Sequence, residues 1–262
     1  MTKILLVGCG KMGSAMLSGW LDQGITASDV VVVEPSLPSL GVAVVASPCD
    51  IAPDFAPDVV VLAVKPQVMA EALPPYARFG AAVFLSIAAG KPIAFFRTHL
   101  GADADLIRAM PNTPAAVRRG ITVCCAGPGV SADQRALCQS LLESVGEVGW
   151  VEDESLMDAV TAVSGSGPAY LFLLAEAMAA AGRAQGLPDD LAVRLARSTV
   201  AGAGELLRQS SESAEQLRKN VTSPGGTTAA ALAVLMADNN GLPALMGQAV
   251  AAATRRGREL AG

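Results

Sequence analysis

The chain has 262 residues, a formal net charge of −5, and 52% hydrophobic, 16% charged and 4% aromatic residues. That length allows one large domain or two of ordinary size, and the acidic balance argues against nucleic acid or an anionic membrane as a main partner. The single histidine, His99, rules out a His-paired metal site and leaves any catalytic triad dependent on that one residue. The five cysteines have no metal-ligand spacing, so we expect reduced thiols that behave as small hydrophobic residues.

The high hydrophobic content requires a check for a membrane span, which needs about 18 uninterrupted apolar residues. The best candidate, residues 169–181, is interrupted by Glu176 and followed by Arg183. The N-terminus leads directly into a strand-like segment, without the charged region and cleavage site of a signal peptide. We therefore expect a cytoplasmic protein with no membrane partner.

The first 151 residues alternate short apolar runs with longer amphipathic ones. Near-continuous runs of Val, Ile and Leu are typical of a parallel sheet covered on both faces, and strand–helix alternation indicates right-handed crossovers. Residues 1–151 are therefore predicted to form an α/β domain, a Rossmann-type doubly wound and mostly parallel sheet. The predicted strands are 4–7, 30–33, 42–45, 58–64, 82–87, 106–110, 121–126 and 147–151, with a helix at 12–23.

Strand patterns stop near residue 151, and residues 152–262 are predicted to form an all-helical domain. Its long helices carry many small residues on several sides, as in residues 177–182 and 201–204. Such helices are expected to pack against a partner, so we predict a homodimer or higher oligomer formed through this dimerisation domain. A tightly packed monomeric bundle is the alternative. The helices are expected at 166–186, 188–209, 227–236 and 243–258.

The segment Gly8–Gly13 has the pattern G-x-G-x-x-G, follows the first predicted strand and opens a helix. In that context the first glycine makes a tight turn, the second admits a pyrophosphate, and the third lets the helix pack on the strand. The helix N-terminus adds free N–H donors and a positive dipole end. The segment therefore predicts dinucleotide binding, with a purely structural turn as the alternative.

Glu34 ends the second predicted strand, about 20 residues after the glycine loop, where an acidic side chain accepts hydrogen bonds from the ribose hydroxyls of NAD. A 2′-phosphate would be repelled there, and Glu34–Leu37 contains no Lys or Arg. The position favours NADH over NADPH. The alternative is a solvated Glu34 without a role.

Five further segments stand out: 63–67, 86–90, 110–114, 165–170 and 221–228. The first three follow predicted strands, at whose carboxyl ends ligands bind in open α/β sheets. In their order and spacing, the segments resemble the pyrroline-5-carboxylate reductase family over the whole chain, and Val221 to Asp238 resembles its signature in the helical domain. The resemblance implies reduction of a small imino acid, 1-pyrroline-5-carboxylate, to L-proline by NADH or NADPH. This is the last step of proline biosynthesis, and it needs no metal.

The loop at 225–228 suits a substrate carboxylate, because Gly225, Gly226, Thr227 and Thr228 present backbone N–H groups at a predicted helix start. Thr228 occupies the family's active-site threonine position. There its hydroxyl can form a hydrogen bond with the imine nitrogen and stabilise or relay the proton of that nitrogen. The resemblance also places three residues around the substrate or the loop that holds it, with a helix N-cap as the alternative for Ser223 and a solvated side chain for Glu154. They are Glu154, Asn220 and Ser223.

The residues expected to bind the cofactor come from the glycine loop, the end of the second strand, and two loops that the resemblance places along the nicotinamide half. Many family members carry a polar or basic residue after the second strand, where this chain has Glu34, so the choice of cofactor stays open. Lys65 has a surface lysine as its alternative interpretation, and His99 is expected to be structural. The predicted set is Val7, Gly8, Cys9, Gly10, Lys11, Met12, Gly13, Glu34, Ser36, Ala63, Val64, Lys65, Pro66, Ile87, Ala88 and Ala89.

Three other functions are alternatives to this reductase. A β-hydroxyacid dehydrogenase needs a lysine on the first long helix of its second domain, and no lysine occurs between Lys91 and Lys219. A non-catalytic NAD(P)-binding module is disfavoured because the loop at 225–228 is intact. A reductase of a related cyclic imine stays open, since backbone recognition of a carboxylate does not report ring size.

Overall fold

The computed structural model describes residues 2–261, and the chain divides into two compact units. The first comprises Met1–Gly165 and Ala253–Gly262, and the second comprises Ser166–Ala252. The predicted boundary at 151/152 follows the last strand, whereas the packing boundary falls later. Met157 and the short helix around it still pack on the first unit's sheet, which explains the difference.

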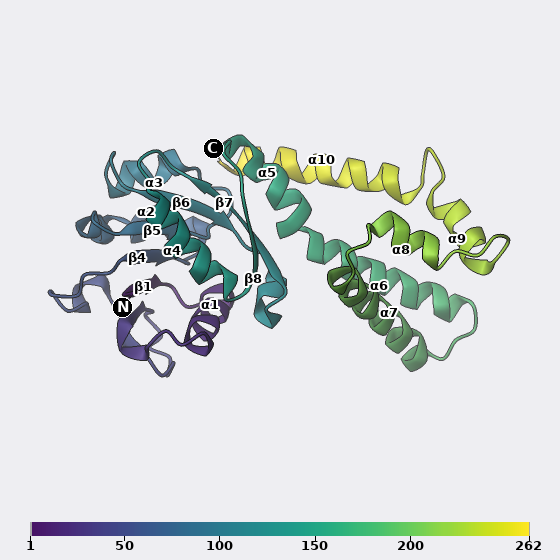
Figure 1. The fold of residues 1–262 in the computed structure, drawn as a ribbon, viewed down its shortest axis with the longest axis horizontal. Coiled ribbons are helices and arrows are strands. Elements are labelled where there is room, and N and C mark those ends of the chain that lie inside the picture. The colour runs from purple at the N-terminus through teal and green to yellow at the C-terminus, as the bar shows by residue number, and fades with distance from the viewer. Residues whose placement is uncertain (1, 262) are drawn as a thin grey trace. The chain divides into compact units, whose positions relative to one another are not determined.

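The first unit is built on an eight-stranded sheet in the order β3-β2-β1-β4-β5-β6-β7-β8 (Figure 1). Every neighbouring pair is parallel except β6 and β7, which are antiparallel. The predicted Rossmann-type, mostly parallel sheet is confirmed, with shifts only at strand ends. The strands are β1 (Ile4–Val7), β2 (Val30–Val33), β3 (Ala43–Val45), β4 (Val59–Leu62), β5 (Val83–Ser86), β6 (Leu106–Met110), β7 (Gly120–Ala126) and β8 (Gly146–Trp150).

Successive residues of each central strand enter two separate cores, one on each face of the sheet. In β1, Ile4 and Leu6 join a core with Trp20 of α1 (Lys11–Asp22), while Leu5 and Val7 join the opposite core. Burial on both faces removes the need for alternating polar residues, so the strands are continuously apolar. The other helices of this unit are α2 (Met69–Ala72), α3 (Ile93–Leu100), α4 (Ala132–Glu143) and α5 (Met157–Val160). The 3-10 helices are η1 (Ala27–Asp29), η2 (Pro48–Asp50), η3 (Pro66–Val68), η4 (Pro74–Phe79), η5 (Thr113–Val117) and η6 (Glu154–Leu156), and η7 (Thr161–Gly165) is a π-helix.

The second unit contains helices only, as predicted. They are α6 (Gly167–Ala184), α7 (Asp189–Gln209), α8 (Ala214–Asn220), α9 (Thr227–Leu235) and the larger part of α10 (Leu242–Ala261). Its buried hydrophobic residues are three alanines, Ala179, Ala192 and Ala196. Large apolar side chains such as Phe172, Leu206 and Val234 are exposed instead. The unit therefore leaves most of its large apolar side chains without cover. Across residues 2–261, no helix combines the length and apolarity that a membrane crossing requires.

Candidate active site

The glycine loop joins β1 to α1, and two of its glycines are fixed by close packing. Gly8 has φ +87°, and a Cβ there would lie 2.8 Å from Val64 Cγ1. A Cβ at Gly13 would lie 2.7 Å from the carbonyl oxygen of Gly8. Both positions therefore require glycine for the fold, which matches the turn and packing roles that the motif predicts.

Gly10 differs, because a Cβ there would meet nothing within 4 Å. It is the N-cap residue of α1, whose first turn has neither a capping side chain nor an acidic residue. Lys11 follows it on the exposed surface. Open space, unpaired first-turn N–H groups and a cation at the positive end of a helix together fit a phosphate group.

Glu34 lies against this loop, where its Oε2 accepts a hydrogen bond from the Cys9 N–H at 2.9 Å. Its Oε1 accepts from the Ser36 hydroxyl at 3.2 Å and the Ser36 N–H at 3.4 Å. Three donors thus hold the carboxylate at the carboxyl end of β2. These contacts place Glu34 beside the glycine loop, and its role in cofactor binding stays a prediction.

The strand order places the predicted cofactor loops side by side. The chain proceeds from β1 to β2 in one direction and to β4 and β5 in the other, and ligands bind at such a switch point. The Ala63 N–H bonds the Val7 carbonyl at 2.8 Å, and the Ile87 N–H bonds the Leu62 carbonyl at 3.2 Å. The structure therefore brings the glycine loop, Ala63–Pro66 and Ile87–Ala89 to one edge of the sheet.

Glu154 lies in the first unit and bridges three elements. Its Oε1 accepts from the Ile93 N–H at the start of α3 at 2.8 Å and from Arg108 Nη1 at 3.0 Å. The Arg108 side chain is only 6% exposed and also lies 3.9 Å from Asp158 Oδ1. Glu154 is therefore a partner of a buried charge, and the interpretation of it as a solvated residue is wrong. Sequence reasoning missed Arg108, although a single basic residue inside the apolar run of β6 is a visible signal.

The predicted carboxylate-binding loop lies in the second unit, between α8 and α9. Gly226 is the N-cap residue of α9, and the first turn of α9 has neither a side-chain cap nor an acidic residue. Gly225 has φ +70°, and a Cβ at Gly226 would lie 2.4 Å from Ser223 Oγ. These glycines permit the turn that leaves the N–H groups of Thr227 and Thr228 at an uncapped helix start.

Asn220 and Ser223 lie on the α8 side of the two glycines. Asn220, the last residue of α8, donates to Glu212 Oε2 at 3.0 Å and accepts from Gln216 Nε2 at 2.8 Å. The N-cap of α9 is Gly226, so the alternative interpretation of Ser223 as that helix's cap is wrong. Ser223 thus precedes the two glycines in the loop, and Thr228 follows them in the first turn of α9.

The remaining candidate groups have no chemical role in this arrangement. The His99 Nδ1 pairs with the Phe95 carbonyl at 2.9 Å, and its ring lies on the Phe95 ring. All five cysteines are free. Burial raises the pKa of Cys124 and raises that of Cys138 to about 12, so both thiols are protonated at neutral pH. Over residues 2–261, no group of three or more His, Cys, Asp or Glu side chains has the arrangement of a metal site.

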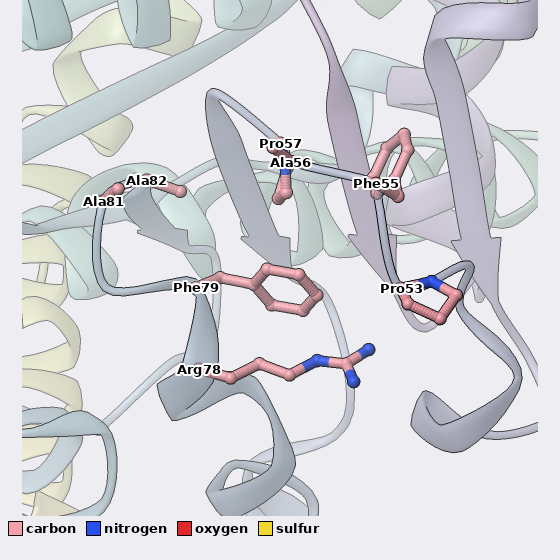
Figure 2. Close-up of a pocket in the computed structure, with 8 residues that line it drawn as sticks. All are labelled: Pro53, Phe55, Ala56, Pro57, Arg78, Phe79, Ala81 and Ala82. Carbon is pink, nitrogen blue, oxygen red and sulfur yellow. The ribbon is translucent and has the colours of Figure 1, made fainter.

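A shallow pocket of about 240 Å³ lies away from these loops (Figure 2). Pro57 and Ala82 precede β4 and β5, so the pocket is at the amino-terminal edge of the sheet, opposite the edge that binds ligands in such folds. Arg78 lies over the Phe79 ring and donates to the Pro48 carbonyl at 3.2 Å. We assign this pocket no part in the active site. Its lining residues are Pro53, Phe55, Ala56, Pro57, Arg78, Phe79, Ala81 and Ala82.

Comparison with known proteins identifies the family. Residues 154–260 match the model described as pyrroline-5-carboxylate reductase dimerisation, and residues 3–90 match that of NADP oxidoreductase coenzyme F420-dependent. A pyrroline-5-carboxylate reductase of Pseudomonas aeruginosa is 40% identical over 99% of this chain and 97% of its own. This chain belongs to the pyrroline-5-carboxylate reductase family.

Solved structures of family members have a similar fold. The pyrroline-5-carboxylate reductase of Coxiella burnetii has a TM-score of 0.92 at 35% identity, over 99% of this chain and 98% of that one. The Plasmodium falciparum pyrroline carboxylate reductase with NADP bound has a TM-score of 0.85 at 28% identity, over 100% and 98%. The predicted family, fold and nicotinamide-dependent oxidoreductase class are confirmed.

Proposed function

We propose that this pyrroline-5-carboxylate reductase family member reduces the C=N bond of 1-pyrroline-5-carboxylate to give L-proline, the last step of proline biosynthesis. One observation carries the proposal: the start of α9, with Ser223 before it and Thr228 in its first turn, has no side-chain cap, which suits a small carboxylate. The names of the relatives support the same reaction.

The dinucleotide fits the residues of the first unit. Gly10 leaves space beside the uncapped start of α1, where the pyrophosphate would bind with Lys11 alongside. Ala63–Pro66 and Ile87–Ala89 would line the nicotinamide half from the ends of β4 and β5. When bound, the reduced nicotinamide supplies the hydride.

In the second unit, the N–H groups of Thr227 and Thr228 and the Ser223 hydroxyl would bind the substrate carboxylate, with Gly225 and Gly226 allowing close approach. The Thr228 hydroxyl would hydrogen-bond the ring nitrogen and hold its proton while the imine carbon is reduced. A protonated imine is the better acceptor, and the product amine keeps its proton, so no strong base is needed. We also assign Asn220 and Glu154 to the surroundings of the substrate or of the loop that holds it.

We further propose that NADH is preferred over NADPH. Glu34 is held at the end of β2 by the Cys9 N–H and by both donors of Ser36. A carboxylate fixed there accepts from ribose hydroxyls and repels a 2′-phosphate. The Plasmodium falciparum relative, by contrast, binds NADP in its solved structure. The preference proposed here rests on Glu34 alone.

We propose a homodimer or higher oligomer, located in the cytoplasm, with the second unit as the contact. The match to a dimerisation model supports this assembly. So does the exposure of large side chains in a unit that buries only alanines.

A comparison of two cyclic imines as substrates tests the proposed function. The purified protein with NADH is given 1-pyrroline-5-carboxylate or its six-membered homologue, and the amino acid formed is identified by chiral chromatography. We expect L-proline, with a kcat/KM for the five-membered ring at least about tenfold higher, a difference of about 1.4 kcal/mol. Faster reduction of the six-membered ring would make the protein a reductase of that imine.

A further inference from the structure

A π-helical turn follows α5 and ends at Gly165, where the first segment of the first unit ends. This turn, η7, covers Thr161–Gly165. π-helical turns are rare and occur frequently at functional sites. A Cβ at Gly165 would lie 2.5 Å from Met110 Cε, and Met110 is the last residue of β6. The turn therefore packs over the end of β6.

The Ser164 hydroxyl, within this turn, is buried and makes no hydrogen bond. In residues 2–261 it is the one buried side-chain nitrogen or oxygen without a partner. A helical Ser or Thr commonly bonds the carbonyl four residues earlier, as Thr161 does with Met157 at 2.8 Å and Thr98 with Ala94 at 3.0 Å. Ser164 lacks this bond because the extra residue of a π-turn displaces the carbonyls of the preceding turn.

The register of the sheet places this turn near the nicotinamide half of the proposed cofactor site. Ser86 of β5 pairs with Arg108 of β6. Ser86 is the last residue of β5, and β6 continues for two more residues to Met110. Gly165 contacts Met110, so Ser164 lies beside the edge at which Ile87–Ala89 emerge.

We propose that Ser164 is a ligand-binding residue whose hydroxyl donates a hydrogen bond to a carbonyl-type oxygen of the bound reactants. That oxygen belongs to the carboxamide of the nicotinamide, which the proposed function places in the first unit, so the inference rests on the proposed function. A buried hydroxyl without a partner destabilises the free protein. Rotation about its Cα–Cβ bond breaks no hydrogen bond, because none exists, and this leaves the group available to a ligand.

The test is Ser164→Ala, with Ser144→Ala as the matched control. Ser144 is also buried, but its hydroxyl donates to the Leu141 carbonyl at 2.6 Å. Removing an unpartnered hydroxyl should raise the thermal midpoint of the ligand-free protein by about 3 °C. The same change should weaken ligand binding about fivefold, the worth of one hydrogen bond. The control should lower the midpoint and leave binding unchanged.

The Kd for NADH tests this assignment. A fivefold higher Kd for NADH in Ser164→Ala, measured by fluorescence without substrate, supports a hydrogen bond to the carboxamide. The proposal is overturned if the Kd for NADH stays at its wild-type value, or if the midpoint falls. NADH binding and thermal unfolding require no turnover, so failure of the wild-type protein to reduce the imine would refute the proposed function separately.

Discussion

Thr228 is the residue on which the proposed proton step depends. Replacing it with alanine removes the hydroxyl at the ring nitrogen but leaves the N–H groups at the start of α9 in place. We therefore expect Thr228→Ala to lower kcat about 100-fold, within the usual range for general acid–base groups. The Kd for NADH, measured by fluorescence, should stay unchanged.

Thr228→Ser is the matched variant, because it keeps the hydroxyl and removes one methyl group. It should retain most of the wild-type kcat. Weaker NADH binding in Thr228→Ala would show that Thr228 contacts the cofactor, which contradicts its proposed role at the ring nitrogen of the substrate.

The second prediction at the scale of single residues concerns the negative charge of Glu34. Glu34→Gln keeps an oxygen that can accept from the Cys9 N–H but removes the negative charge. Without that charge a 2′-phosphate is less repelled, so the ratio of kcat/KM for NADH to that for NADPH should fall about tenfold. Glu143→Gln, an exposed change on α4, is the control for altered net charge. A wild-type protein that strongly prefers NADPH would refute the argument from Glu34.

The glycine loop and α1 act as one element, and two substitutions separate its packing from its ligand contact. Gly13→Ala places a Cβ 2.7 Å from the Gly8 carbonyl oxygen and should destabilise the fold by about 1–3 kcal/mol. Gly10→Ala meets no atom within 4 Å and should shift the thermal midpoint by less than about 3 °C.

Gly10→Ala should nevertheless weaken NADH binding at least about tenfold, because its methyl group occupies space that the pyrophosphate needs. Titration of the folded variant with NADH measures this effect. Wild-type affinity in Gly10→Ala would mean that the loop does not approach the pyrophosphate.

Element prediction from the sequence succeeded where packing is simple. The central strands β1, β4 and β5 are buried on both faces, so their continuous apolar runs identified them, and only their ends shifted. Sequence patterns did not identify α5 or the π-helical turn η7, since both depend on tertiary contacts over β6 and β7. They also did not show that Glu154 pairs with Arg108, because the two residues are distant in sequence.

At the scale of the whole molecule, the second unit should not be stable with its large apolar side chains in water. The unit buries only three alanines among its hydrophobic residues. Light scattering coupled to size-exclusion chromatography should therefore give at least a dimer at micromolar concentration. A monomer that remains folded under those conditions would contradict this prediction.

The candidate site was predictable from the sequence to different degrees in the two units. The glycine loop and the loop at 225–228 are local motifs, and the structure shows both at uncapped helix starts. The strand-end loops converge only through the sheet order, which local patterns do not encode. The Ser164 hydroxyl had no sequence signal, because its lack of a partner arises from the π-turn.

The central claim is that this protein transfers hydride from a reduced nicotinamide to the C=N bond of 1-pyrroline-5-carboxylate. The most direct measurement uses NADH that carries two deuterium atoms on C4 of the nicotinamide, the carbon that gives up the hydride. The product is analysed by mass spectrometry. The account predicts L-proline with one deuterium on the carbon of the former C=N bond. Proline without deuterium, or no proline with either NADH or NADPH, would contradict it.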